Sequence, residues 1–258
     1  MGSRVASRRS ALPVIGVVLP ISIVVLLGAP FIGAQPAVRL HPPFTGAAGF
    51  VMVYGNTTGR CSHANSSVLR APSANGTTGV VRSLTHACAT APALVNGTGG
   101  TRAAFIETSV GFRGPAFNVT TSARYRIEFR WNITWNATGS TTGTGAFTAQ
   151  IALFGNILNG TSGRFIRAIQ TTAVVGWSPT GTCAPACSSA GSRALVLNFT
   201  VRLSAGQTYR FYTDMYTRIS VTASSSCNLV NCVSGTASVT LNVATGANAG
   251  RLTTVLVV

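Results

Sequence analysis

Few residues of this 258-residue chain have the chemistry for acid–base catalysis, because only three are acidic: Glu107, Glu128 and Asp214. Glycoside hydrolysis uses a pair of carboxylates, and calcium sites need clusters of carboxylates. The chain has no G-x-S-x-G motif, and "GSTTGTG" at 139–145 lacks the lysine of a phosphate-binding loop. We therefore expect no enzymatic activity, no catalytic residue and no cofactor.

Two cysteine–histidine motifs contain the residue types of a zinc site. "CSH" at 61–63 is mirrored by "HAC" at 86–88, and two Cys with two His are able to hold zinc in a tetrahedron. Their spacing matches no zinc finger, and in an oxidising compartment a disulfide competes for the thiols. We therefore predict a Cys61–Cys88 disulfide and no metal. Local pairing is also favoured for the other four cysteines, with crossed pairing left open: Cys183 with Cys187, and Cys227 with Cys232.

N-glycosylation triplets are more frequent than chance predicts. The chain has 14 Asn and 57 Ser plus Thr, so roughly three N-x-[ST] triplets are expected at random. Three triplets share the repeat N-G-T-x-G, and Asn-Gly favours positive φ in tight turns, which predicts glycans at loop tips. The excess indicates a glycoprotein exposed outside the cell. Nine asparagines begin such triplets: Asn56, Asn65, Asn75, Asn96, Asn118, Asn132, Asn136, Asn159 and Asn198.

The net charge of +16 comes from 19 basic residues, all of them arginine. Such a balance often indicates nucleic-acid binding, but these arginines are scattered singly and the chain has the features of an exported protein. We therefore expect no nucleic-acid partner. A surface polysaccharide or another anionic surface fits better, although a solvated basic surface without a partner explains the charge equally well.

Alternating apolar and polar residues predict antiparallel strands. In "SARYRIEFRWNITWNATG", which begins at Ser122, Tyr, Ile, Phe and Trp occupy odd positions, and Arg, Glu, Thr and Asn occupy most even ones. This pattern is typical of a strand with one buried face. It makes Trp131 and Trp135 core residues in preference to a platform for sugar rings. Similar patterns at 145–156, 192–221 and 236–258, separated by Gly-, Ser- and Asn-rich turns, predict an antiparallel β-sandwich of the jelly-roll or Ig-like kind.

The segment 192–221 predicts a hairpin with a turn at 204–207 and four outward-facing side chains of interest. Tyr residues beside Arg residues are suited to a shallow glycan or partner surface, although cross-strand pairing explains them as well. For the acids, we expect Glu128 to pair with Arg126 or Arg130, and Asp214 to pair with an arginine four residues away. The candidate binding surface consists of Arg210, Tyr212, Tyr216 and Arg218.

The first 34 residues predict a signal or membrane-anchor helix. Arg4, Arg8 and Arg9 precede an uncharged span of 29 residues that ends before Arg39, and such a span is long enough to cross a bilayer. The basic residues in front predict that the C-terminal part lies outside the cell. Residues 35–46, "QPAVRLHPPFTG", are then a proline-stiffened linker, and residues 47–258 form the extracellular domain.

Residues 8–29, "RRSALPVIGVVLPISIVVLLGA", resemble the N-terminal segment of archaeal type IV pilin-like proteins. The resemblance rests on "PVIGV" at 13–17 and the apolar run "ISIVVL" at 21–26, while Pro20 departs from the pattern. It implies cleavage by a prepilin peptidase near Ser10 and Ala11, and a retained helix that packs in a filament or stays in the membrane. A signal-peptidase cut after Ala34 and an uncleaved anchor remain alternatives.

Together these features predict a non-enzymatic cell-surface or secreted glycoprotein, with a pilin-like filament or envelope component as the structural form. The membrane is then a partner through the N-terminal helix, and self-association would run through this helix or through strand exchange at a sheet edge. The alternative is a secreted module that binds carbohydrate or an anionic surface.

Overall fold

The computed structural model describes residues 38–54, 64–91, 100–171, 174–179, 182–227 and 232–258, with the backbone alone for 47–54. The described chain is all-β, its strands pair antiparallel, and these ranges contain no α-helix. Accordingly, they contain no helix long and apolar enough to cross a membrane. The predicted N-terminal helix and its cleavage sites lie outside the described residues. Residues 36–258 form one compact unit.

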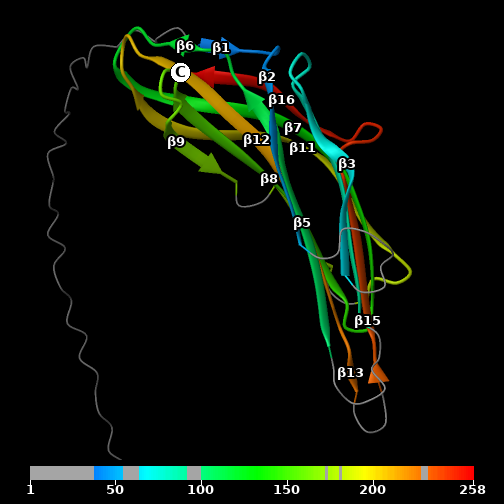
Figure 1. Cartoon of the computed structure of the whole chain (residues 1–258). Coiled ribbons are helices and arrows are strands. Elements are labelled where there is room, and N and C mark those ends of the chain that lie inside the picture. The colour runs from blue at the N-terminus through cyan, green and yellow to red at the C-terminus, as the bar shows by residue number, and fades with distance from the viewer. Residues whose placement is uncertain (1–37, 55–63, 92–99, 172–173, 180–181, 228–231) are drawn as a thin grey trace, which may run out of the picture. The chain divides into compact units, whose positions relative to one another are not determined.

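Sheet A has seven strands in the order β1, β16, β4, β15, β7 and β11, with β3 added beside β4 (Figure 1). The first half of β7 pairs with β16 and its second half with β15, so these two strands follow one another along the same flank of β7. The bounds are β1 Val38–Leu40, β3 Ala64–Asn75, β4 Val80–Ala91, β7 Ala123–Thr142, β11 Cys187–Leu203, β15 Gly235–Asn242 and β16 Ala249–Val257.

Sheet B has seven strands in the order β10, β8, β12, β5 and β2, with β6 paired to β12 and β9 to β8. The long strands from β4 to β12 alternate between the sheets, so that β5, β8 and β12 in sheet B are separated in sequence by β7 and β11 in sheet A. The bounds are β2 Thr45–Tyr54, β5 Thr101–Arg113, β6 Phe117–Asn118, β8 Ala146–Asn159, β9 Phe165–Gln170, β10 Val175–Trp177 and β12 Thr208–Ser224; a small hairpin consists of β13 Ser226–Cys227 and β14 Cys232–Val233.

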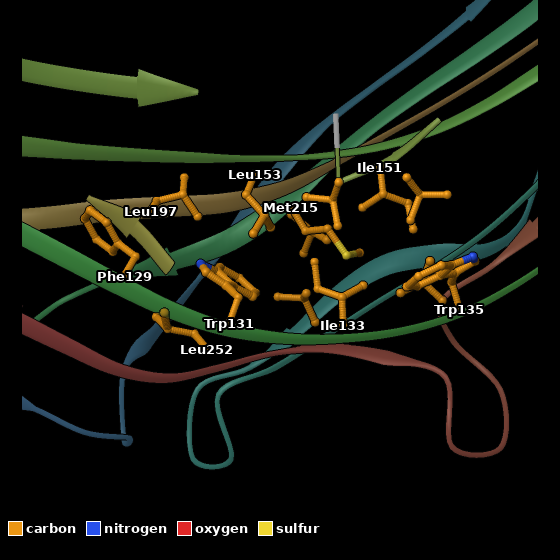
Figure 2. Close-up of a cluster of buried hydrophobic side chains, with 14 of the residues drawn as sticks. Phe129, Trp131, Ile133, Trp135, Ile151, Leu153, Leu197, Met215 and Leu252 are labelled. Carbon is orange, nitrogen blue, oxygen red and sulfur yellow. The ribbon is translucent and has the colours of Figure 1, made fainter. Parts of the chain in front are cut away.

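The core lies between the sheets and is centred on β7. Trp131 and Ile133 are fully buried and Trp135 is 6% exposed, which confirms their predicted place in the core. Figure 2 shows the Trp131 and Ile133 side chains directed towards Leu153 of β8 and Met215 of β12. Glycines on the core face make room for the rings, because a Cβ at Gly155 would lie 2.7 Å from the Phe129 ring, and one at Gly191 would lie 2.7 Å from the Trp135 ring.

A chain of buried hydroxyl groups joins the two sheets inside the core. Ser83 of β4 is hydrogen-bonded to Thr108 of β5 at 2.9 Å, and Thr108 to Thr217 of β12 at 2.6 Å. Trp131 Nε1 donates to Thr213 Oγ1 at 3.3 Å. Buried polar groups need such partners to offset their desolvation, so these bonds help to fix how the sheets align.

The strands predicted from alternation are confirmed, including the turn between β11 and β12 at 204–207. The segment β3 was not predicted, because two register shifts and Pro72 interrupt its alternation. Strands β9 and β10 are short and also escaped prediction. Within the range 35–46, for which a linker is predicted, β1 pairs with β16 and Phe44 packs against Phe112 and Phe211.

Both described N-G-T-x-G repeats form turns, but the predicted backbone geometry is wrong. The repeat at 75–79 connects β3 to β4, and the repeat at 159–163 connects β8 to β9. Positive φ occurs at Gly79 and Gly163, the last residue of each repeat, and at no residue other than glycine among those described. The Asn side chain instead accepts backbone hydrogen bonds within the turn, as Asn159 does from Thr161 and Ser162, and such Asx turns place no demand on its own φ.

We predict that Gly155→Ala destabilises the fold by about 1–3 kcal/mol, the usual cost of overpacking a core. The added Cβ meets the Phe129 ring, which Phe199 and Phe211 hold from other sides. Denaturant unfolding measures the change. Gly100→Ala is the control, because nothing lies within 4 Å of its Cβ position; equal losses in the two variants would contradict this view of the core.

Candidate functional site

The outer face of sheet B carries the predicted binding surface. Strand β12 lies between β5 and β8, and its core-facing residues alternate with polar ones. Arg210, Tyr212, Asp214, Tyr216 and Arg218 all have the outward phase, opposite to the buried Phe211 and Met215. The four predicted residues therefore share one face of one strand, but their contacts divide them into two groups.

In the first group, Tyr216 and Arg218 are bound to Glu107 of the neighbouring β5. Arg218 Nε lies 3.3 Å from Glu107 Oε1, and its guanidinium carbon lies 5.8 Å from the centre of the Phe105 ring. Burial, followed by the hydrogen bond to Glu107 and the charge of its carboxylate, raises the pKa of Tyr216 to about 12. The guanidinium charge of Arg218 is thus largely neutralised within the protein.

In the second group, Asp214 is held by hydroxyl groups and not by arginine. It is 8% exposed and accepts hydrogen bonds from Ser109 Oγ and, at 3.2 Å, from Tyr212 OH. The predicted pairing of Asp214 with Arg210 or Arg218 is wrong, because residues four apart on one strand are separated by about 13 Å. Glu128, two residues from each of its candidates, does pair with Arg126 and Arg130, both at 3.0 Å.

Burial raises the pKa of the Asp214 carboxyl, and the hydrogen bonds from Ser109 and Tyr212 oppose that rise only in part. The pKa of Tyr212 is raised to about 12, first by burial and then by the charge of Asp214. Gly111, opposite Asp214 on β5, is required for this packing, because a Cβ there would lie 2.6 Å from the Asp214 Cβ.

A cavity of about 540 Å³ opens beside this second group. Arg113 of β5 lies directly opposite Tyr212, and Arg210 lies directly opposite Leu158 of β8. Phe165 of β9, which is 68% exposed, also lines the cavity. The turn at 159–163 completes the lining, and no carboxylate is among the lining residues.

The cavity has the chemistry of an anion site with an apolar wall. Arginine binds carboxylates through two parallel N–H···O bonds, and neither Arg113 nor Arg210 makes an ion pair with another described residue. A phenol and an exposed aromatic ring lie beside them, the combination that suits a ring-shaped ligand with an acidic group. Of the predicted surface, Arg210 and Tyr212 line this cavity, whereas Tyr216 and Arg218 do not.

Sequence reasoning missed Arg113, Phe165 and the turn at 159–163 as parts of the site. Arg113 is the last residue of β5, and its contact with β12 depends on a pairing between strands about 100 positions apart. Phe165 belongs to β9, which the alternation pattern does not reveal. The turn was identified, but only as a glycan site.

Six of the seven described glycosylation candidates are exposed or half-exposed. Asn132 and Asn198 lie on the outer face of sheet A, and Asn75 and Asn159 begin turns. Asn65 differs, because it is 8% exposed and pairs with Cys88 across β3 and β4. The half-exposed residue Asn136 and the exposed residue Asn118 complete the set, whereas Asn56 and Asn96 lie outside the described residues.

Two of the three predicted disulfides are confirmed, Cys183–Cys187 and Cys227–Cys232. Cys88 is also disulfide-bonded, and its predicted partner Cys61 lies outside the described residues. His86 Nδ1 is hydrogen-bonded to Thr240 at 2.8 Å, and burial lowers its pKa. The described ranges contain no group of three or more His, Cys, Asp or Glu side chains close enough to hold a metal ion.

No protein-family model matches the sequence, and no curated protein matches it either. Among solved structures, the enzymatically active domain of tailspike protein 4 from bacteriophage CBA120 is similar over 71% of this chain and 19% of its own length, with 10% identity and a TM-score of 0.16. The structure of infectious bursal disease virus, Gt strain, is similar over 65% of this chain and 41% of its own, with 8% identity and a TM-score of 0.15. Scores this low support no argument about fold or function.

We predict that Asp214→Asn unfolds at a higher denaturant concentration than the wild type at pH 7. The folded state raises the pKa of this carboxyl above its ordinary value of 3.8, so the folded state binds the proton more tightly than the unfolded chain does. The stability from this group is therefore complete below pH 3.8 and is lost as pH rises through the folded pKa. The neutral amide avoids that loss, and the advantage of the variant should shrink towards pH 3.

Glu107→Gln is the matched control on the neighbouring strand. It removes a partly exposed ion pair, so it should lower the free energy of unfolding at pH 7 by at most about 1 kcal/mol. An Asp214→Asn variant less stable than the wild type at pH 7 would show that the carboxylate form is the one favoured by the fold.

Proposed function

We propose that the chain is a non-enzymatic glycoprotein of the cell surface, with an extracellular β-sandwich held at the membrane or in a filament by its N-terminal apolar segment. The observation that carries this proposal is the placement of the N-x-[ST] triplets. Asn132 and Asn198 alternate with the core residues of β7 and β11 and are exposed, so the strands direct them to solvent, where an attached glycan costs no packing.

The disulfides support an oxidising environment. Cys183–Cys187 and Cys227–Cys232 each close a short loop, and structural disulfides persist mainly in exported proteins. The scarcity of carboxylates supports a non-enzymatic role, because Glu107 and Glu128 are each paired with arginine. The pilin-like segment at 8–29 provides the proposed route of attachment or assembly.

The strand order supports a jelly roll as the particular form of sandwich. Four adjacent positions of sheet A are β4, β15 with β16, β7 and β11, and four adjacent positions of sheet B are β5, β12, β8 and β9 with β10. The connections among these positions pass from one sheet to the other, except for the β8–β9 hairpin within sheet B and the connections within a shared position. Eight strand positions in two such sheets are typical of jelly rolls, which serve viral capsids and lectins alike.

We predict that mass spectrometry of the protein from its native source finds a mature N-terminus at or near Ala11 and glycans on Asn132 and Asn198. Asn65 should be unmodified, because it is buried between β3 and β4. A mature chain that begins at Gln35 would contradict the pilin-like attachment, and unmodified Asn132 and Asn198 would contradict the glycoprotein.

A second function has a specific observation in its favour. Arg113 and Arg210 line one cavity with Tyr212 and the exposed ring of Phe165, whereas Arg218 on the same strand is neutralised by Glu107. Two guanidinium groups that form no ion pair within the described part of the chain, beside aromatic side chains, suit a uronic acid, which combines a carboxylate with a sugar ring. The sandwich would then bind acidic polysaccharide at this site.

We predict that Arg210→Ala weakens binding of polygalacturonate about tenfold or more, since a hydrogen bond to a charged group contributes about 1.5–3 kcal/mol. Arg218→Ala, eight positions along β12, should bind as the wild type does because its guanidinium does not line the cavity. Calorimetry at constant ionic strength measures both, with dextran as the uncharged polymer.

Thr161→Ala is a control for an effect of a glycan at Asn159 on binding. It removes the glycosylation triplet that borders the cavity and keeps Asn159, whose side chain accepts hydrogen bonds within the turn. If Arg210→Ala and Arg218→Ala weaken binding equally, the interaction is with the general basic surface and the cavity has no special role.

A further inference from the structure

Two arginines lie directly opposite one another on the outer face of sheet A. Arg124 of β7 pairs in register with Arg202 of β11. The Arg126 backbone exchanges both of its hydrogen bonds with Val258, on the flank of β7 away from β11. In a strand, the N–H and C=O groups of residues two apart point to the same flank. The N–H and C=O groups of Arg124 therefore also point away from β11. The Arg124–Arg202 pair is therefore of the non-hydrogen-bonded kind, in which facing side chains are closest.

Neither arginine of this close pair forms an ion pair with a carboxylate of the described residues. Glu128 lies on the same face of β7, but it is bound on both sides, by Arg126 and by Arg130 at 3.0 Å each. Like charges directly opposite one another destabilise a sheet. Glu128 thus offsets part of the charge of Arg126 and Arg130, whereas Arg124 and Arg202 have no ion pair with another described residue.

A third arginine comes to the same place from the other sheet. Arg167 of β9 lines a hollow of about 270 Å³ together with Arg124 and Arg202, and Thr200 and Val201 complete the lining. None of the three guanidinium groups forms an ion pair or side-chain hydrogen bond with another described residue. Three strands therefore direct full positive charge and free N–H donors to one hollow.

We propose that Arg124, Arg167 and Arg202 form a binding site for a tetrahedral oxyanion, a phosphate or sulfate group, either free or as an ester on a polymer. One carboxylate has two oxygens and is satisfied by one or two guanidinium groups, whereas the oxygens of a phosphate or sulfate accept from three at once. The Thr200 hydroxyl lies in the same lining as a further donor. The bound anion would link β9 of sheet B to β7 and β11 of sheet A.

This site is separate from the cavity beside Tyr212, with which it shares no lining residue. It also differs in chemistry, since its lining contains no aromatic side chain to stack on a sugar ring. The inference does not depend on the proposed carbohydrate-binding function, and the two are tested with different variants.

The test is the thermal unfolding of the full-length protein with sulfate or phosphate added at low millimolar concentration, against chloride at the same ionic strength. A ligand that binds only the folded state raises the Tm, so the wild type should show a rise. Arg202→Gln should have a higher Tm than the wild type in chloride, because the repulsion from Arg124 is gone, and it should lose the response to sulfate. Binding should weaken about tenfold or more.

Arg167→Gln separates the site from general charge effects. This variant should also lose the response to sulfate, while its Tm in chloride stays near that of the wild type, because Arg167 has no directly opposite arginine on its paired strand. Arg164 is an exposed arginine just before β9 that makes no ion pair with another described residue and is not part of the hollow, so Arg164→Gln should respond as the wild type does. An equal sulfate response in all three variants would overturn the proposal.

Dextran sulfate, compared with dextran and with inorganic sulfate, distinguishes the two sources of the anion. Binding of dextran sulfate that is lost in Arg202→Gln and Arg167→Gln assigns the site to a polymer-borne ester. If these variants lose the response to inorganic sulfate but bind dextran sulfate as well as the wild type does, the site holds the free anion.

Discussion

The alternation of side chains along β7 and β12 is the constraint on which the other features depend. These strands are central in their sheets, so each has one face against the other sheet and one face towards solvent. Trp131 and Met215 meet in the core as a result (Figure 2), and Glu128 and Asp214 are placed on the opposite faces. A shift of one residue in either strand would exchange core and surface completely, and for that reason the register is well determined.

The scarcity of carboxylates determines where the surface charge remains available. The two glutamates form ion pairs with arginines on the same strand or on the adjacent strand. These arginines are Arg126, Arg130 and Arg218. The charge of described arginines outside these ion pairs is not offset by a glutamate. Where strand pairing brings such arginines together, they line a hollow. The places where positive charge gathers on the described surface therefore depend on the positions of the two glutamates as much as on the number of arginines.

The sequence predicted the elements with strong alternation and failed where tertiary pairing decides the outcome. The phase of Trp131 and the hairpin of β11 and β12 follow from local pattern alone. Arg113 enters the site because β5 pairs with β12, a contact that no local pattern encodes. The predicted partner of Asp214 is wrong because the burial of this residue beside Gly111 and Ser109 depends on the pairing of β5 with β12. The prediction for Glu128 is right because its arginine partners lie on its own strand.

The edges of the sheets bear on how copies of this chain would assemble. An exposed flat edge strand invites pairing with another chain, and proteins prevent this with prolines, bulges and inward-pointing charges. At one edge of sheet A, β3 contains Pro72 and two register shifts. At the other edge, Arg193 of β11 has the phase of the core residues and donates to the Val174 carbonyl at 2.8 Å. In sheet B, β2 and β9 each contain a register shift. The register shifts, Pro72 and Arg193 thus disfavour strand exchange at these described edges.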